Sequence, residues 1–214
     1  GTLITVNSSS SGATVTSGTG GSSAGNGGSD STPVFNYAGV VNGANTTGPV
    51  AGALTLTAAP TFVVTSTEDS GTGSLREALA SANAAGSGNI TFDPSVFATP
   101  QTVTLQSTLV IPSNTTITGA TSGSGPALTN LVTISGGGSS SDFSIFSVGS
   151  GVTATISNLI LANGYTSSEG GGIDNAGVLT VTGSTFENNC AAGYMGTGNG
   201  GGAIYSSNNL TIRN

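Results

Sequence analysis

Three carboxylates in the last third of the chain, Glu169, Asp174 and Glu187, have types and spacing that could support chemistry. Glycoside hydrolysis needs two carboxyl groups about 5–9.5 Å apart, one of them a general acid and the other a base or nucleophile. The three acids lie near repeated strand segments, so they are the candidate glycan site of this chain. Acids on solvated turns are the competing interpretation, and we expect no catalytic residue among them.

The charged residues exclude most other chemistries. The 214 residues include nine acids and two arginines but no lysine or histidine, and the net charge is −7. Without His there is no Ser-His-Asp or Cys-His nucleophile system, and without Lys there is no Schiff base and no P-loop. A lyase would need an Arg or Lys base, but Arg76 falls in a predicted helix and Arg213 has no acid near it in sequence. The sequence therefore predicts that the chain is not an enzyme.

Metal ions, cofactors and nucleic acids are equally poor matches for this composition. A calcium site needs about six to eight oxygen ligands. The best places for one are Glu68-Asp69 and the loop from Glu169 to Asp174, and neither has the spacing of a known calcium loop. Two arginines cannot form the basic surface that nucleic acid requires. We expect no metal and no cofactor, and we expect Cys190 to be a small buried apolar residue.

Short strand segments must position these side chains. Versions of one Thr-rich strand recur from residue 100 onward, between Gly, Ser and Asn turns, at 103–105, 109–111, 116–119, 132–136, 155–158, 180–183 and 211–214. One such turn of chain cannot bury its own apolar residues, whereas stacked turns pool them into one core. Gly and Asn suit the corners, where a positive φ is needed. The pattern predicts an all-β fold, a right-handed parallel β-helix (a solenoid) over residues 61–214.

One helix and an N-terminal arm complete the predicted organisation. Ser74 and Glu77 have the spacing of a capping box, and they open a short capping helix near residues 74–85. Residues 1–60 form a Ser/Thr/Gly-rich β arm, with strand-like pieces at 3–6, 13–16, 33–37 and 53–57 and a flexible connector at 18–31. No run is apolar enough for a transmembrane helix.

Two sets of residues resemble known surface proteins. Phe186 to Asn189 has the form FxxN, and Gly201, Gly202, Ala203 and Ile204 have the form GGAI. These resemble the paired motifs of the chlamydial polymorphic outer membrane protein repeat, which occurs in autotransporter-like adhesins. Residues 65–79 resemble the DSGxGSLRxAL opening of large bacterial right-handed β-helix surface proteins. The resemblance implies an extracellular or cell-surface location and a short helix that caps the first turn of the solenoid.

The ends of the predicted solenoid suggest how it could be used. The sequence stops at Asn214 inside a strand-like segment, and an exposed strand edge invites pairing with another chain. Either the solenoid continues in a longer protein, or a neighbouring copy completes the edge with its N-terminal arm or by head-to-tail stacking. Apolar residues that could form such an assembly arm are Leu3, Ile4, Val6 and Val15.

Three functions follow as hypotheses. The first is a self-assembling subunit of a surface filament, fibre or matrix, whose partner is a copy of itself. The second is a fragment of an autotransporter-like adhesin that binds a host or abiotic surface. The third is a carbohydrate-binding or carbohydrate-active β-helix module.

Overall fold

The computed structural model describes the backbone of residues 2–9, 12–19, 36–41 and 44–49 and the whole of residues 59–193 and 201–213. The chain divides into two units, Gly1–Thr57 and Ala58–Asn214. The predicted strand at 53–57 and most of the predicted connector at 18–31 lie outside the described residues.

The N-terminal unit contains two antiparallel hairpins. Strand β1 (Thr2–Ser9) pairs with β2 (Gly12–Thr19), and β3 (Asn36–Val41) pairs with β4 (Ala44–Pro49). The predicted segments at 3–6 and 13–16 fall in β1 and β2, where Val6 lies opposite Val15. These arm strands therefore pair with each other.

The second unit is built mostly of strands in parallel sheets. Its largest sheet has six strands in the order β22-β18-β14-β9-β6-β5, and all neighbouring pairs are parallel. The strands are β5 (Thr61–Val64), β6 (Ser87–Phe92), β9 (Asn114–Thr118), β14 (Thr153–Ser157), β18 (Val178–Thr182) and β22 (Leu210–Arg213).

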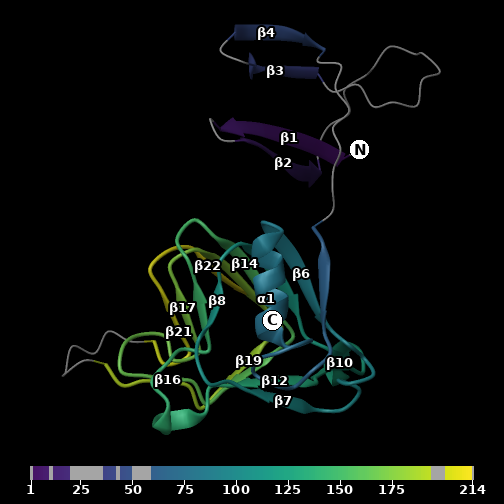
Figure 1. Cartoon of the computed structure of the whole chain (residues 1–214). Helices are drawn as coiled ribbons and strands as arrows, with labels where there is room; N and C mark the ends of the chain where they lie inside the picture. Colours follow the sequence, from purple (N-terminus) through teal and green to yellow (C-terminus); the bar gives the residue numbers. More distant parts are fainter. Residues whose placement is uncertain are drawn as a thin grey trace. The chain divides into compact units, whose positions relative to one another are not determined.

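Two four-stranded parallel sheets accompany the large one (Figure 1). The β7 sheet consists of β7 (Gln101–Thr104), β12 (Val132–Ser135), β15 (Ile160–Ala162) and β19 (Thr185–Glu187). The β8 sheet consists of β8 (Leu109–Ile111), β13 (Phe146–Val148), β17 (Ile173–Asn175) and β21 (Ile204–Ser206).

The chain visits these sheets in a fixed order. It passes from the β7 sheet to the β8 sheet and then to the six-stranded sheet, and this order recurs through β7-β8-β9, β12-β13-β14, β15-β17-β18 and β19-β21-β22. We call each such set of three strands a triplet. Every strand of one triplet pairs with the corresponding strand of the next, so residues about 25 to 40 positions apart become neighbours.

Small elements extend from the corners between the sheets. Strand β16 (Tyr165–Thr166) pairs in parallel with β20 (Cys190–Ala191), and β10 (Thr121–Ser122) pairs antiparallel with β11 (Thr129–Asn130). Two short 3₁₀ helices, η1 (Gly125–Ala127) and η2 (Gly138–Ser140), lie in the same connections. As the sequence predicts, some corners use asparagine at positive φ: Asn158, Asn163 and Asn188 have φ of 57°, 57° and 53°.

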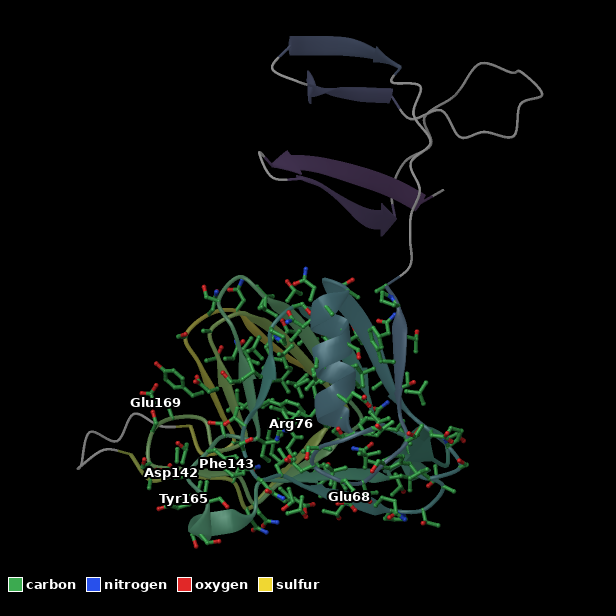
Figure 2. The ribbon with its side chains drawn as sticks, in the orientation of Figure 1. Glu68, Arg76, Asp142, Phe143, Tyr165 and Glu169 are labelled. Atoms are coloured by element: carbon green, nitrogen blue, oxygen red, sulfur yellow. The ribbon has the colours of Figure 1, made fainter. Side chains whose placement is uncertain are left out.

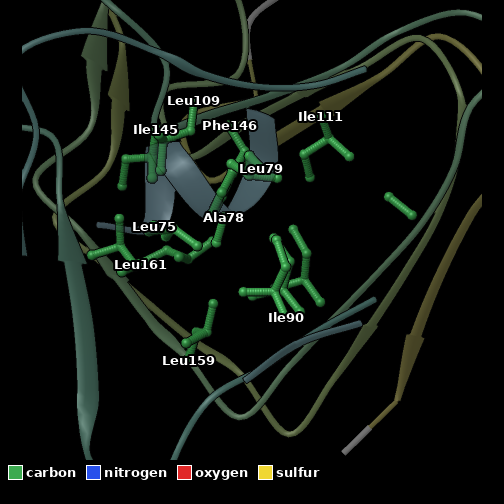
Figure 3. Close-up of a cluster of buried hydrophobic side chains, with 14 of the residues drawn as sticks. Leu75, Ala78, Leu79, Ile90, Leu109, Ile111, Ile145, Phe146, Leu159 and Leu161 are labelled. Atoms are coloured by element: carbon green, nitrogen blue, oxygen red, sulfur yellow. The ribbon is translucent and has the colours of Figure 1, made fainter. Parts of the chain in front are cut away.

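The core lies between the sheets because every long strand alternates apolar and polar residues. In β14, for example, Ala154 and Ile156 are fully buried while Thr153, Thr155 and Ser157 face outward. Figure 3 shows the apolar side chains of several strands gathered between the sheets, beside three residues of the helix. Phe92 and Phe97 add an edge-to-face pair with ring centres 5.0 Å apart.

Helix α1 (Leu75–Ala84) packs on the β5, β6 and β8 end of the unit. Its apolar face is buried as the 3.6-residue period requires: Leu75, Ala78, Leu79 and Ala82. Ser74 is the N-cap, and its hydroxyl accepts the backbone N–H of Glu77. The return bond differs from a standard capping box, because the Glu77 carboxylate accepts from the N–H of Gly73 and the Ser74 N–H bonds Gly71 O.

Candidate functional site

Two of the three candidate carboxylates come together beside a tyrosine. Asp174 points outward from the centre of β17, and parallel pairing places Tyr205 of β21 directly next to it. Glu169 lies in the loop that leads into β17, and its carboxylate is close enough to the Tyr205 hydroxyl to raise the pKa of Tyr205. The site therefore joins a loop, a middle strand and an edge strand of the β8 sheet.

The pKa shifts in this cluster arise because the carboxylates of Glu169 and Asp174 carry like charges and Asp174 is partly buried. Burial raises the pKa of Asp174, and the negative charge of Glu169 raises it further. The hydrogen bond to Glu169 is the main reason that the pKa of Tyr205 is raised, followed by the charge of Glu169, burial and the charge of Asp174. Tyr205 is consequently a neutral hydroxyl beside two acids, an arrangement that can bind the hydroxyl groups of a polar ligand.

Glu187 does not join this cluster. It is exposed at the end of β19, in the β7 sheet, where its direct strand partner is Ala162. Asp174 belongs to the β8 sheet, so the two outward-facing side chains leave the unit from different faces. The structure thus divides the predicted trio into the pair Glu169–Asp174 and a separate Glu187.

The second predicted acidic place, Glu68-Asp69, is occupied by an ion pair. Arg76 of α1 lies 2.6 Å from the Asp69 carboxylate and also donates to Ser107 O and Thr108 O. These bonds tie the helix to the loop before β8, so Arg76 and Asp69 have a structural role. Among the described residues, no three His, Cys, Asp or Glu side chains are grouped in a way that could hold a metal ion.

The other acidic side chain near the Glu169 loop also serves the fold. Figure 2 shows Asp142, Phe143, Tyr165 and Glu169 on the same flank of the unit. Asp142 accepts the N–H and the hydroxyl of Ser167 at 2.6 and 2.7 Å, and these bonds lower the pKa of Asp142. Beside it, the N–H of Phe143 donates to Tyr165 O at 2.7 Å. This group joins two consecutive triplets at a corner.

The FxxN residues connect neighbouring triplets. Phe186 packs against the core from β19. The Asn189 side chain accepts the N–H of Gly164 and donates to Leu161 O, both at 2.8 Å. Asn189 thereby fixes the corner after β19 onto the corresponding corner after β15.

The GGAI residues lie where the backbones of neighbouring triplets approach each other closely. Gly202 O accepts the N–H of Gly172, and Ala203 O accepts the N–H of Ile173. A Cβ on Gly202 would lie 2.8 Å from Asn189 O, so a larger residue would force this corner apart. Gly201 stands at the start of the same turn, and Ile204 packs against the core.

The two ends of the core differ. At the β5 and β6 end, α1 covers the apolar residues. At the other end, the core-facing positions of β22 are exposed: 37% of Leu210 and 64% of Ile212 is accessible. The equivalent residues of the preceding strand, Leu179 and Val181, are buried. Within the described residues, this end of the core, formed by β19, β21 and β22, therefore leaves core-facing apolar side chains exposed.

The sequence did not indicate the buried hydrogen bonds of Asn175, and the burial expected for Cys190 was wrong. Asn175 is fully buried, and its side chain bonds Gly177, Ser206 and Asn209, which joins β17 to the following triplet. Its position two residues before a glycine in a turn was the available signal. The expectation that Cys190 is buried is wrong: its thiol is exposed, because β20 lies outside the three large sheets.

Comparison of the sequence with protein families and with curated proteins finds no match. No protein family matches the chain, and no curated protein is similar enough in sequence to count as a relative. Within the described residues, no helix is long and apolar enough to cross a membrane.

Proposed function

We propose that the second unit is a right-handed parallel β-helix. The support is the repeated order of the strands, which carries the chain around the same three sheets four times. Right-handed winding is proposed because parallel crossover connections overwhelmingly take that hand. A crystal structure tests this directly, and a left-handed course of the chain through β12, β13 and β14 would refute it.

We propose further that the protein is an extracellular structural protein that assembles with copies of itself. The observation that carries this proposal is the exposure of Leu210 and Ile212 at core-facing positions of an edge strand. Burying a Leu or Ile side chain stabilises a contact by about 1.5–3 kcal/mol. Within the described residues β22 is paired on one side, with β18, so an added strand would cover both side chains and pair with its other edge.

The difference between the two ends of the core favours one mode of assembly over the other. Direct head-to-tail stacking would place an open apolar end against an end that α1 already covers, which leaves the apolar surfaces unmatched. A strand supplied by another copy fits better, and each N-terminal hairpin has outer edges that could supply it. Such a contact joins two different surfaces and therefore propagates into a filament.

Point variants of the whole chain test this assembly. Ile212→Lys places a charge on the open end and should abolish filaments in electron micrographs and fast-sedimenting material in the ultracentrifuge. Val110→Lys is the matched control, because Val110 is also an exposed β-branched strand residue (55% accessible) but lies on the outer face of the β8 sheet. Deletion of residues 1–30 should have the same effect as Ile212→Lys. Monodisperse monomers of the unaltered chain at high concentration would refute the proposal.

A glycan-binding surface is the second candidate, and the Glu169–Asp174–Tyr205 cluster favours it. Two acids and a neutral tyrosine hydroxyl could bind sugar hydroxyl groups without hydrolysing the glycan. A glycan array probed with the unaltered chain and with Tyr205→Ala decides the question. Binding that is lost in the variant supports this candidate, whereas an array without signal removes it. The adhesin hypothesis shares this test, since an adhesin must bind a surface ligand.

A further inference from the structure

The outer face of the six-stranded sheet carries two ranks of side chains, most of which bear a hydroxyl group. Alternation places every second residue of each strand on this face. The first rank, read from β5 to β22, consists of Thr61, Asn89, Thr116, Thr155, Thr180 and Thr211. The second rank consists of Val63, Thr91, Thr118, Ser157, Thr182 and Arg213.

The ranks are in register across the whole sheet. Thr116 lies opposite Thr155, Thr155 opposite Thr180 and Thr180 opposite Thr211, with no offset between strands. Neighbouring strands are about 4.8 Å apart, and residues two positions apart along a strand are separated by about 6.6 Å. The face is therefore a two-dimensional lattice of hydroxyl and methyl groups with fixed repeats.

The side chains of this lattice are short and stiff. Threonine has two heavy atoms on Cβ, which restricts χ1 and keeps the hydroxyl in one place. One hydroxyl contact crosses between strands, from Ser157 to Thr118 at 3.3 Å. A shallow hollow of about 360 Å³ lies beside the first residues of these strands, and its lining includes Asn89, Thr116 and Thr155 of the first rank. These three side chains therefore border open space.

Charge is nearly absent from this face although the chain carries net −7. Among the outward positions of the described strands of this six-stranded sheet, Arg213 is the one charged residue, and it lies on the edge strand β22. The acids of this unit lie on other elements, including Asp174 on β17 and Glu187 on β19. A surface that is uncharged and periodic in two dimensions favours a ligand surface that is also uncharged and periodic in two dimensions.

We propose that this face binds ice. The repeat between neighbouring strands is close to an oxygen repeat on the exposed planes of hexagonal ice, and the repeat along a strand is somewhat shorter than the second one. Each hydroxyl can replace a lattice water as donor and acceptor, and the methyl groups order the water between them. A crystalline polysaccharide is also uncharged and periodic, but stacking on a sugar ring wants aromatic side chains, and no outward position of the described strands of this sheet is aromatic.

The proposal is independent of self-assembly, and the whole chain tests it. The unaltered protein should shape growing ice crystals, open a gap between melting and freezing temperatures and inhibit ice recrystallisation. Thr155→Lys, in the middle of the lattice, should lose these effects. Thr133→Lys is the matched control: Thr133 is a partly exposed outward threonine of the middle strand β12, but it belongs to the β7 sheet and should keep full activity.

Thermal unfolding shows whether each variant is folded, and Thr180→Lys replaces Thr155→Lys if the latter is not. Absence of any effect of the unaltered chain on ice overturns the proposal. So does equal loss in Thr133→Lys, or full activity in a folded Thr155→Lys. Sedimentation with insoluble cellulose or chitin is the parallel assay, and binding there without an effect on ice would assign the face to a polysaccharide instead.

Discussion

Replacement of Asn189 by alanine probes the contact between consecutive triplets most directly. The side chain accepts the N–H of Gly164 and donates to Leu161 O, and both bonds are 2.8 Å long in a partly buried corner. Each bond of this kind contributes about 1 kcal/mol, and a buried group that loses its partner costs about 1–3 kcal/mol. Because the corner is partly open to water, we expect Asn189→Ala to lower the free energy of unfolding by about 2 kcal/mol.

Urea unfolding followed by circular dichroism measures this loss, and thermal unfolding should show a decrease in Tm of about 4–8 °C for a chain of this size. Asn208→Ala is the matched control. Its side chain also reaches the preceding triplet, at Ala176 O, but the bond is 3.3 Å long and exposed. A change within about 0.5 kcal/mol is expected there.

A third variant separates the two bonds of Asn189. Asn189→Asp keeps an oxygen for the Gly164 N–H but replaces the amide donor with a second acceptor that faces Leu161 O. It should be at least as destabilising as alanine at neutral pH and should recover in part when the acid is protonated. The reasoning is refuted if Asn189→Ala and Asn208→Ala have equal stability.

Three further predictions concern charge and packing. Hydrogen bonds from Ser167 lower the pKa of Asp142, so the stability that Asp142 contributes is present above the ordinary aspartate pKa and is lost as pH falls through the lowered value. Asp142→Asn should therefore reduce the loss of stability in acid, measured as urea midpoints against pH. An unchanged loss of stability in acid would contradict this prediction. Burial, and after it the charge of Glu169, raises the pKa of Asp174, so the stability linked to this group is present at low pH and is lost as pH rises. Asp174→Asn should therefore be more stable than the unaltered chain at neutral pH, and the difference in stability should disappear in acid. A difference that stays constant with pH would contradict this prediction. Ile156→Ala removes a fully buried side chain and should cost about 2–5 kcal/mol by urea unfolding, whereas a loss below 1 kcal/mol would mean that the core is not close-packed there.

Local features of the fold were predictable because they depend on near neighbours in sequence. The helix follows from Ser74, Glu77 and an apolar residue on every turn, and it forms at Leu75–Ala84. The capping-box return bond to Gly73 was not predictable, since it depends on how the preceding loop folds. Thr-Ile-Thr at 116–118 likewise fixes one face inward and one outward before any partner strand is known.

The candidate site was predictable only in part, because sequence spacing does not say which strands become neighbours. Glu169 and Asp174 are five residues apart and close enough for the charge of Glu169 to raise the pKa of Asp174, whereas Glu187 lies on another sheet. The position of Tyr205 beside Asp174 was not predicted, because the two residues become neighbours only by parallel pairing across 31 positions. The buried side chain of Asn175 was missed for the same reason, since two of its partners, Ser206 and Asn209, belong to the following triplet.

The sequence alone determined the alternation of strands, the one helix and the asparagines and glycines at corners, because each is set by local sterics and hydrophobic period. The tertiary structure decided the register between strands, which brought Asp174 to Tyr205 and aligned the threonines from Thr61 to Thr211. Register depends on the lengths of the connections and on core packing between distant segments. A rank of threonines is therefore invisible in any single strand and exists only when the strands are stacked.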